Sequence, residues 1–80
     1  MSLNLRIVSP EKVEFEGQAD RVVVPGTGGE FEILVNHAPI ISTLECGRIA
    51  FYDSEGEHVI KTLGGFVEVK KNSVSICVEL

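Results

Sequence analysis

Glycine and proline interrupt this chain so often that long helices have almost no room. The 80 residues include eight glycines and three prolines, at positions 10, 17, 25, 26, 28, 29, 39, 47, 56, 64 and 65. Only one interval without either residue, 66–80, is longer than nine residues. Helices in globular proteins average about 11 residues, and glycine and proline both destabilise helix interiors. This spacing therefore favours short strands joined by tight turns.

Apolar and polar residues alternate within the intervals between these breaks. Residues 66–70 and 73–80 alternate on either side of Lys71-Asn72, which predicts a hairpin, and Asp53-Ser54-Glu55-Gly56 predicts a second turn. The other alternating segments are residues 3–7, 12–16, 31–35 and 49–51. A single sheet of this length would leave one apolar face in water. We therefore predict an all-β fold, a two-sheet antiparallel β-sandwich of about eight to ten short strands.

Length and composition indicate one small globular domain spanning residues 1–80. The chain is 44% hydrophobic and 24% charged, with no internal repeat or linker, which is typical of a folded domain rather than a disordered one. A domain of this size buries only about 60% of the surface of its unfolded chain. We expect modest stability and folding without a cofactor.

Charge argues against several classes of partner. Seven basic and 12 acidic residues give a net charge of -5, which repels phosphate backbones and anionic lipid headgroups. Acidic residues crowd the first 32 positions, which predicts either a solvated acidic face or a surface for a basic partner.

Apolar runs reach four residues at most, and the N-terminus lacks the pattern of a signal peptide. We therefore predict no nucleic acid partner, no direct membrane insertion and no export.

The two cysteines, Cys46 and Cys77, are too few for the disulfide framework of a small secreted domain. A reduced intracellular setting is the simpler interpretation. Under it, both residues are predicted to be core thiols.

The glycine-rich segment Pro25-Gly26-Thr27-Gly28-Gly29 superficially resembles a phosphate-binding loop. Such a loop requires a lysine followed by serine or threonine and a helix N-terminus behind it. Glu30 and a strand pattern follow instead, so we predict a connection between strands and no bound nucleotide. The pair Gly64-Gly65 predicts a bulge or a close approach of two backbones.

Metal binding and catalysis have no supporting pattern. No two of His37, Cys46, His58 and Cys77 have the spacing of two to five residues that presents a zinc ligand pair. A nucleophile such as Cys46 or Ser42 with His37 as base lacks any recognisable signature. We predict no metal site and no enzymatic activity.

His37 lies in the segment Asn36-His37-Ala38-Pro39, which must be a shaped loop because Pro39 biases Ala38 toward an extended backbone. Two interpretations stay open. The histidine either hydrogen-bonds within its own loop or contributes to a contact surface.

The order of these motifs resembles a known family. The segment Pro25–Gly47, PGTGGEFEILVNHAPIISTLECG, is followed by GGFVEV at Gly64–Val69, with IVSP at residues 7–10 and NSVSI at residues 72–76 as flanks. Together they are similar to the N-terminal β domain of the epsilon subunit of F-type ATP synthases. The similarity extends over nearly the whole chain.

The resemblance implies a ten-stranded sandwich that performs no chemistry. In that family the domain binds the gamma subunit on one side and the polar loops of the c-ring at one end. It is a rotor part of the central stalk that supports the coupling of proton flow to ATP synthesis. The implied location is peripheral, on the cytoplasmic face of a bacterial inner membrane or its organellar equivalent.

The resemblance also implies partner-binding positions. Glu30 matches an acidic position that faces the c-ring loops, where arginine is usual. The remaining implied positions are Asn36, His37, Ala38 and Pro39, close to the gamma and c-ring contacts, and Ser9, Gly64 and Gly65, on or near the gamma-facing side.

Family members usually continue with a pair of C-terminal helices that can restrain ATP hydrolysis and, in some members, bind ATP. This sequence ends at Leu80, so we expect either a short form without the helical hairpin or a chain cut after the sandwich. Whether this protein restrains ATP hydrolysis is therefore left open, because the resemblance attributes that role to the helical pair.

Two alternatives come from other classes. A biotinyl or lipoyl carrier domain has similar size, but its hairpin lysine should have flanking residues that Lys70 and Lys71 lack. Met1 is the only methionine, whereas the biotinyl kind flanks its lysine with methionines. A stand-alone protein-binding adaptor is the other alternative, to be distinguished by whether the chain co-purifies with gamma.

Overall fold

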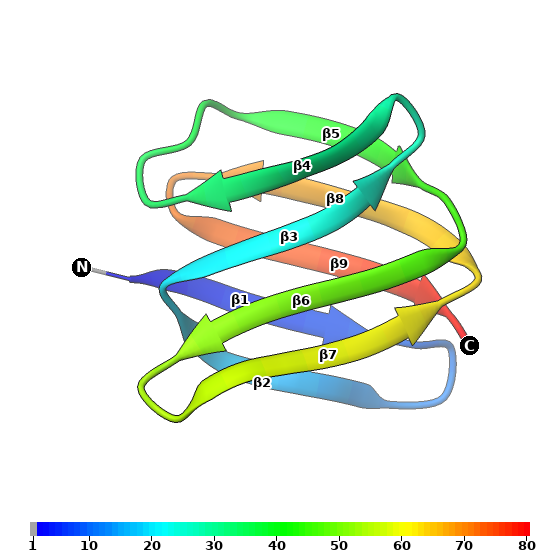
Figure 1. The fold of residues 1–80 in the computed structure, drawn as a ribbon, viewed down its shortest axis with the longest axis horizontal. Coiled ribbons are helices and arrows are strands. Elements are labelled where there is room, and N and C mark those ends of the chain that lie inside the picture. Colours follow the sequence, from blue (N-terminus) through cyan, green and yellow to red (C-terminus); the bar gives the residue numbers. More distant parts are fainter. Residues whose placement is uncertain (1) are drawn as a thin grey trace.

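Nine strands make up the computed structural model, which describes residues 2–80 and contains no helix within that range (Figure 1). The strands are β1 (Leu3–Val8), β2 (Val13–Ala19), β3 (Arg21–Gly26), β4 (Gly29–Leu34), β5 (Ile40–Leu44), β6 (Gly47–Asp53), β7 (Gly56–Thr62), β8 (Gly64–Lys70) and β9 (Ser73–Glu79). The predicted all-β class and strand number are confirmed, with one strand fewer than the resemblance implied.

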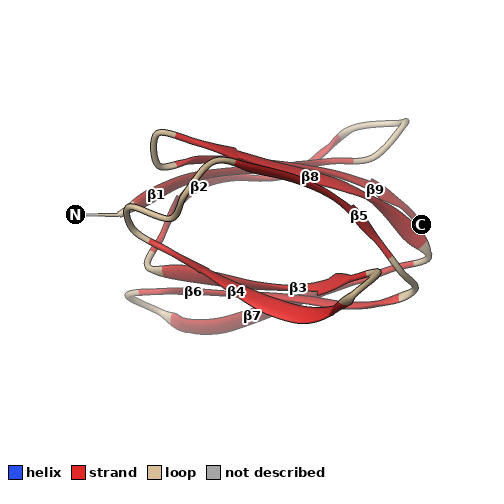
Figure 2. Ribbon diagram, turned by 90° about the horizontal axis from the view of Figure 1, so that it is seen from above, coloured by secondary structure: helices blue, strands red, loops and turns tan. Residues whose placement is uncertain are grey.

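The strands form two facing layers, as Figure 2 shows. Hydrogen bonds connect eight of them in the order β2-β1-β9-β8-β5-β3-β6-β7. The remaining strand, β4, pairs with β3 on the side away from β6. The layers therefore comprise β2-β1-β9-β8-β5 and β4-β3-β6-β7. They meet where Gly26 of β3 pairs with Leu44 of β5. The predicted sandwich is a single sheet that curls over its own core.

One pair of strands departs from the antiparallel prediction. β1 and β9 run parallel, with Leu5 opposite Val74 and Ile7 opposite Ile76. They lie at the two ends of the sequence, so no tight turn forces them to run in opposite directions. The prediction of antiparallel pairing was therefore wrong for β1 and β9. Alternation of apolar and polar residues indicates which side chains face the core, but it does not indicate the direction of the neighbouring strand.

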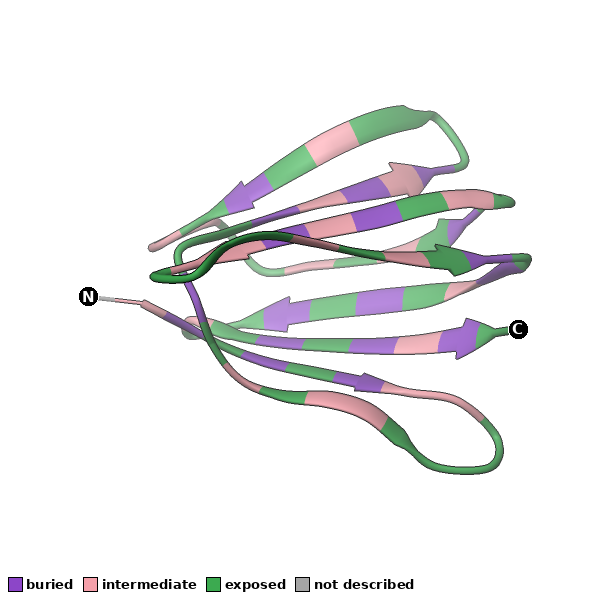
Figure 3. Ribbon diagram, turned by 60° about the horizontal axis from the view of Figure 1, so that its bottom comes forward, coloured by how far each residue is buried: buried purple, intermediate pink, exposed green. Residues whose placement is uncertain are grey.

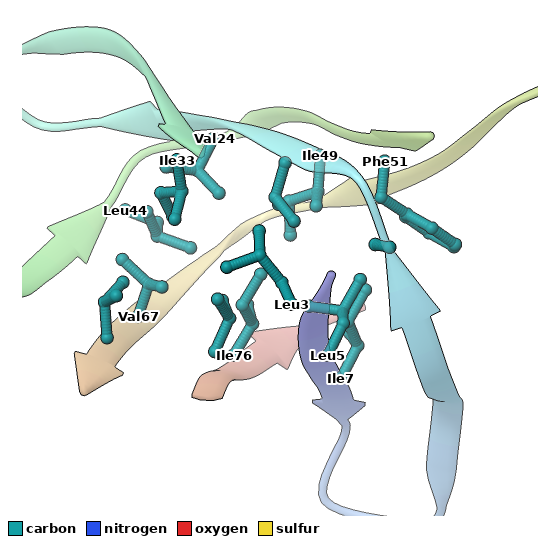
Figure 4. Packing of buried hydrophobic residues seen from close by; sticks show 14 of the residues in the cluster. Leu3, Leu5, Ile7, Val24, Ile33, Leu44, Ile49, Phe51, Val67 and Ile76 are labelled. Carbon is teal, nitrogen blue, oxygen red and sulfur yellow. The ribbon is translucent and has the colours of Figure 1, made fainter. Parts of the chain in front are cut away.

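The core fills the space between the layers with aliphatic side chains. Figure 3 shows buried and exposed residues alternating along most strands. In Figure 4, Leu3, Leu5 and Ile7 of β1 point toward Ile49 and Phe51 of the opposite layer. Burying each such side chain contributes about 1.5–3 kcal/mol relative to exposure. The core is thus the main source of stability in this small domain.

Gly65 occupies a place that no other residue fits. Its φ is +139°, and a Cβ atom added there would lie 1.9 Å from the carbonyl oxygen of Cys77. The predicted close approach of two backbones is confirmed at this position.

The predicted core location of the two cysteines is wrong. Cys46 is exposed in the link between β5 and β6, and Cys77 is half-buried on β9 opposite Phe66. Both thiols are free. Ile76 and Val78, on either side of Cys77, face the core. Side chains alternate along a strand, so the Cys77 side chain points away from the core.

Candidate docking surfaces

The predicted partner-binding residues fall into two groups on the sandwich. Glu30 lies near the start of β4, which in the described part of the chain pairs with β3 alone, and the loop Asn36–Pro39 follows the end of the same strand. We call this strand and loop the β4 edge. Ser9 and Gly64-Gly65 lie on the other layer, at the end of β1 and the start of β8, opposite the Asn36–Pro39 loop along the molecule (Figure 1).

Glu30 is exposed and faces Pro25 across the β3–β4 hairpin. The glycine-rich segment forms this hairpin, with a turn at Thr27-Gly28, as predicted. Glu30 also borders a shallow hollow of about 240 Å³ in the outer surface of this layer. The hollow is lined by Val23, Glu30, Arg48, Ala50, Tyr52 and Glu57.

The loop after β4 is a hydrogen-bonded turn. The His37 backbone N–H donates to the Leu34 carbonyl at 3.1 Å, and Asn36 between them has a φ of 67°. Asparagine tolerates this left-handed conformation better than most residues. The Asn36 N–H donates to Oδ1 of Asn72 at 2.6 Å, which fastens the loop to the β8–β9 turn.

The half-buried His37 side chain takes part in the structure of its own loop. Its Nδ1 lies 2.7 Å from the carbonyl oxygen of Ala38. A carbonyl oxygen only accepts hydrogen bonds, so Nδ1 carries the proton in this contact. The loop-bonding interpretation therefore has a specific contact, and a role in a partner contact stays a proposal.

A ladder of polar side chains crosses the outer face of the β4-β3-β6-β7 layer. Arg21 forms an ion pair with Glu32 at 2.6 Å and its guanidinium lies 4.1 Å from the ring centroid of Tyr52. The Tyr52 hydroxyl donates to Glu57 at 2.7 Å. The hydrogen bond with Glu32 raises the pKa of Arg21, and that with Glu57 raises the pKa of Tyr52. Sequence reasoning missed this ladder, because only the strand register brings these residues together.

The opposite outer face carries an apolar stripe that sequence reasoning also missed. Strand pairing aligns Phe66 of β8 with Cys77 of β9, and Cys77 with Val8 of β1. Ile41 of β5 lies on the same outer face, one diagonal step from Phe66. Ile41 is 73% exposed and Phe66 is 46% exposed. We call these four residues the apolar stripe.

The stripe adjoins the second group of predicted residues. Ser9 follows Val8 directly, and Gly65 precedes Phe66. The signal for the stripe was present in the sequence, since Ile41 and Phe66 occupy positions where the alternation of a half-buried strand calls for polar residues.

Two further properties concern residues 2–80. Within that range no three His, Cys, Asp or Glu side chains gather into a group able to hold a metal ion. None of the described residues forms a helix long and apolar enough to cross a bilayer.

Comparison with known proteins identifies the domain family. The family model "ATP synthase, Delta/Epsilon chain, beta-sandwich domain" matches residues 2–80. The ATP synthase epsilon chain of Leptospira borgpetersenii serovar Hardjo-bovis is 47% identical over 74 residues, covering 92% of this chain and 58% of the relative. The epsilon chain of Nostoc sp. is 39% identical over 80 residues, covering 98% and 58%. This chain therefore spans less than two thirds of the length of these relatives.

Solved structures show the same fold. A chain in the Euglena gracilis mitochondrial ATP synthase (OSCP/F1/c-ring) matches with a TM-score of 0.90 at 18% identity, covering 96% of this chain and 50% of that chain. A chain in the Tetrahymena thermophila mitochondrial ATP synthase (central stalk and c-ring) matches with a TM-score of 0.83 at 15% identity, covering 100% and 65%.

The family match sets aside the carrier-domain alternative, because it extends over nearly the whole sandwich rather than over a single motif. From its sequence and its fold, the chain belongs to the family of ATP synthase delta/epsilon chains, of which residues 2–80 form the β-sandwich domain.

Proposed function

We propose that this chain acts as a non-catalytic rotor part of the central stalk of an F-type ATP synthase. In this role it docks the gamma subunit onto the c-ring and supports the coupling of proton flow to ATP synthesis. Membership of the epsilon family supports the role, since the relatives are ATP synthase epsilon chains. The observation that carries the proposal is the apolar stripe, whose Ile41 and Phe66 side chains are exposed on the outer face of the β2-β1-β9-β8-β5 layer.

The stripe is the surface that we assign to gamma. Exposed apolar groups that adjoin one another mark interaction sites more often than isolated ones do. An aromatic side chain such as Phe66 is the kind of anchor that dominates binding free energy when a partner covers it. Ser9 and Gly64-Gly65 border this surface, which agrees with their proposed place on the gamma-facing side.

The β4 edge is the surface that we assign to the c-ring. The exposed carboxylate of Glu30 suits a basic loop at the start of β4, and the Asn36–Pro39 loop offers a shaped backbone at the other end of the same strand. Arg48 lines the same hollow as Glu30 and repels a basic partner that approaches from the face of the sheet. We therefore propose that a basic loop approaches Glu30 from the free edge of β4.

Contacts with gamma and the c-ring hold the chain at a membrane surface without direct binding to lipid. No part of the chain needs to enter the bilayer, and its net charge of -5 opposes direct binding to anionic lipid. The location that follows is peripheral, on the cytoplasmic face of a bacterial inner membrane or the organellar equivalent. No cofactor, metal or nucleotide takes part in this role.

Thermal unfolding in the presence of purified gamma tests the proposal. A partner that binds only the folded chain raises its apparent stability, by about 2.7 kcal/mol at a concentration 100 times the Kd. We expect the melting transition to rise with gamma concentration. An unchanged transition together with no co-purification with gamma would contradict the rotor role and favour the stand-alone adaptor.

A further inference from the structure

Asn72 joins three parts of the sandwich that are far apart in the sequence. Its Oδ1 accepts the backbone N–H of Asn36 at 2.6 Å, and its Nδ2 donates to Oδ1 of Asn36 at 3.3 Å. Its carbonyl oxygen accepts the N–H of Asn4 at 2.8 Å. One residue of the β8–β9 turn thus contacts both the β4–β5 loop and the first strand.

The backbone of each asparagine suits this arrangement. Lys71 and Asn72 have φ values of 49° and 63°, so both central residues of the two-residue hairpin turn are left-handed, as in the turns that suit hairpin twist. Asn36 has a φ of 67°. Asparagine at both places adopts a conformation that β-branched residues resist, and it supplies a side-chain amide that can both donate and accept.

The loop depends on this contact for its position. Residues 35–39 lie outside the strands in the described structure. The bonds from His37 to the carbonyls of Leu34 and Ala38 are internal to this segment and the strand end before it. Among the hydrogen bonds of the described residues, those with Asn72 tie the segment to another element of the sandwich.

We propose that Asn72 is a positioning residue that fixes the Asn36–Pro39 loop in the conformation presented to a docking partner. The part of this inference that concerns docking rests on the proposed function. The part that concerns the loop itself does not, because the contact is present within the single chain.

Asn72→Gly tests the inference in the 80-residue chain. Glycine adopts a positive φ readily, so the hairpin turn is kept while both side-chain bonds to Asn36 are lost. Lys71→Gly is the matched control, since it makes the same kind of change at the neighbouring position without touching the bonds to Asn36. Asn72→Asp is the conservative variant, because it retains an acceptor for the Asn36 N–H.

Two readouts are measured on each variant: hydrogen exchange of the Asn36 amide by NMR, and affinity for an assembled complex of gamma and c-ring. For Asn72→Gly we expect Asn36 exchange to become roughly threefold to tenfold faster, the range that loss of the single bond to this amide produces, and docking to weaken by a similar factor. Lys71→Gly should change neither readout, and Asn72→Asp should restore most of both.

Unchanged exchange at Asn36 in Asn72→Gly would overturn the inference. Faster exchange with docking equal to that of Lys71→Gly would overturn the role in docking. If the unmodified chain itself fails to dock, the proposed function fails, and the exchange measurement still decides whether Asn72 holds the loop.

Discussion

His58 Nε2 lies 3.0 Å from Asp53 Oδ1, and this pair spans the turn between β6 and β7. The Glu55 backbone N–H donates to the same carboxylate oxygen at 2.8 Å. The hydrogen bond from His58, followed by that from Glu55, lowers the pKa of Asp53 below its ordinary value of 3.8. The imidazole also stacks on Phe51 of the core, with ring centroids 5.1 Å apart.

This pair predicts a contribution to stability that is lost in acid. A carboxyl group with a lowered pKa in the folded state stabilises that state fully above its unfolded pKa. The contribution disappears as the pH falls from about 3.8 through the folded pKa. We expect Asp53→Asn to unfold more readily than the unmodified chain near neutral pH, and the difference to shrink in this acid window.

Urea unfolding across a pH series measures the effect, with Glu55→Gln as the control in the same turn. The control removes an exposed carboxylate that makes no hydrogen bond or ion pair in the described structure. A constant difference between Asp53→Asn and the unmodified chain across the window would contradict the prediction.

Gly65→Ala is expected to destabilise the fold by about 2 kcal/mol or more, since the added methyl group meets the Cys77 carbonyl and the φ of +139° suits glycine. Thermal unfolding measures the loss. Gly28→Ala is the matched control, because an added Cβ there meets nothing within 4 Å. Similar melting temperatures for the two variants would show that the β8–β9 pairing can relax around a side chain.

Glu30→Lys is expected to weaken docking to the c-ring more than it affects folding. The exposed side chain contributes little to stability, whereas reversing its charge turns attraction to a basic loop into repulsion. Affinity for the assembled ring and thermal stability should be measured on the same variant. Glu55→Lys makes the same charge change in the β6–β7 turn, away from the β4 edge, and equal affinities for the two variants would mean that Glu30 is only a solvated residue.

Much of the fold follows from local pattern. The hairpin of β8 and β9 was predicted with its turn at Lys71-Asn72, because alternation on both sides of a turn sets which face of each strand is buried. The turn between β6 and β7 was found in the same way. These features depend on neighbouring residues only.

Other features depend on strands that are distant in the sequence. β3 contains the run Val22-Val23-Val24, which hides its alternation, although Val22 and Val24 face the core and Val23 does not. The parallel pairing of β1 with β9 joins the two ends of the chain. No local pattern encodes either.

The candidate surfaces show the same division. The loop character of Asn36–Pro39 could be predicted from Pro39 and its neighbours. The exposure of Ile41 and Phe66 could be predicted from the alternation, but their grouping with Cys77 required the strand register, and the loop's contact with Asn72 joins residues 36 positions apart. Such contacts exist only once the layers have formed.

The apolar stripe is the surface that we propose docks gamma, and paired affinity measurements on two surface variants test this assignment. Ile41→Ser removes the most exposed apolar side chain of the stripe, whereas Val59→Ser makes a similar change on β7, in the opposite layer. We predict that Ile41→Ser weakens binding to gamma by about tenfold, or about 1.4 kcal/mol, with little change in thermal stability, and that Val59→Ser binds like the unmodified chain. Equal affinity of both variants and the unmodified chain for gamma would contradict the claim.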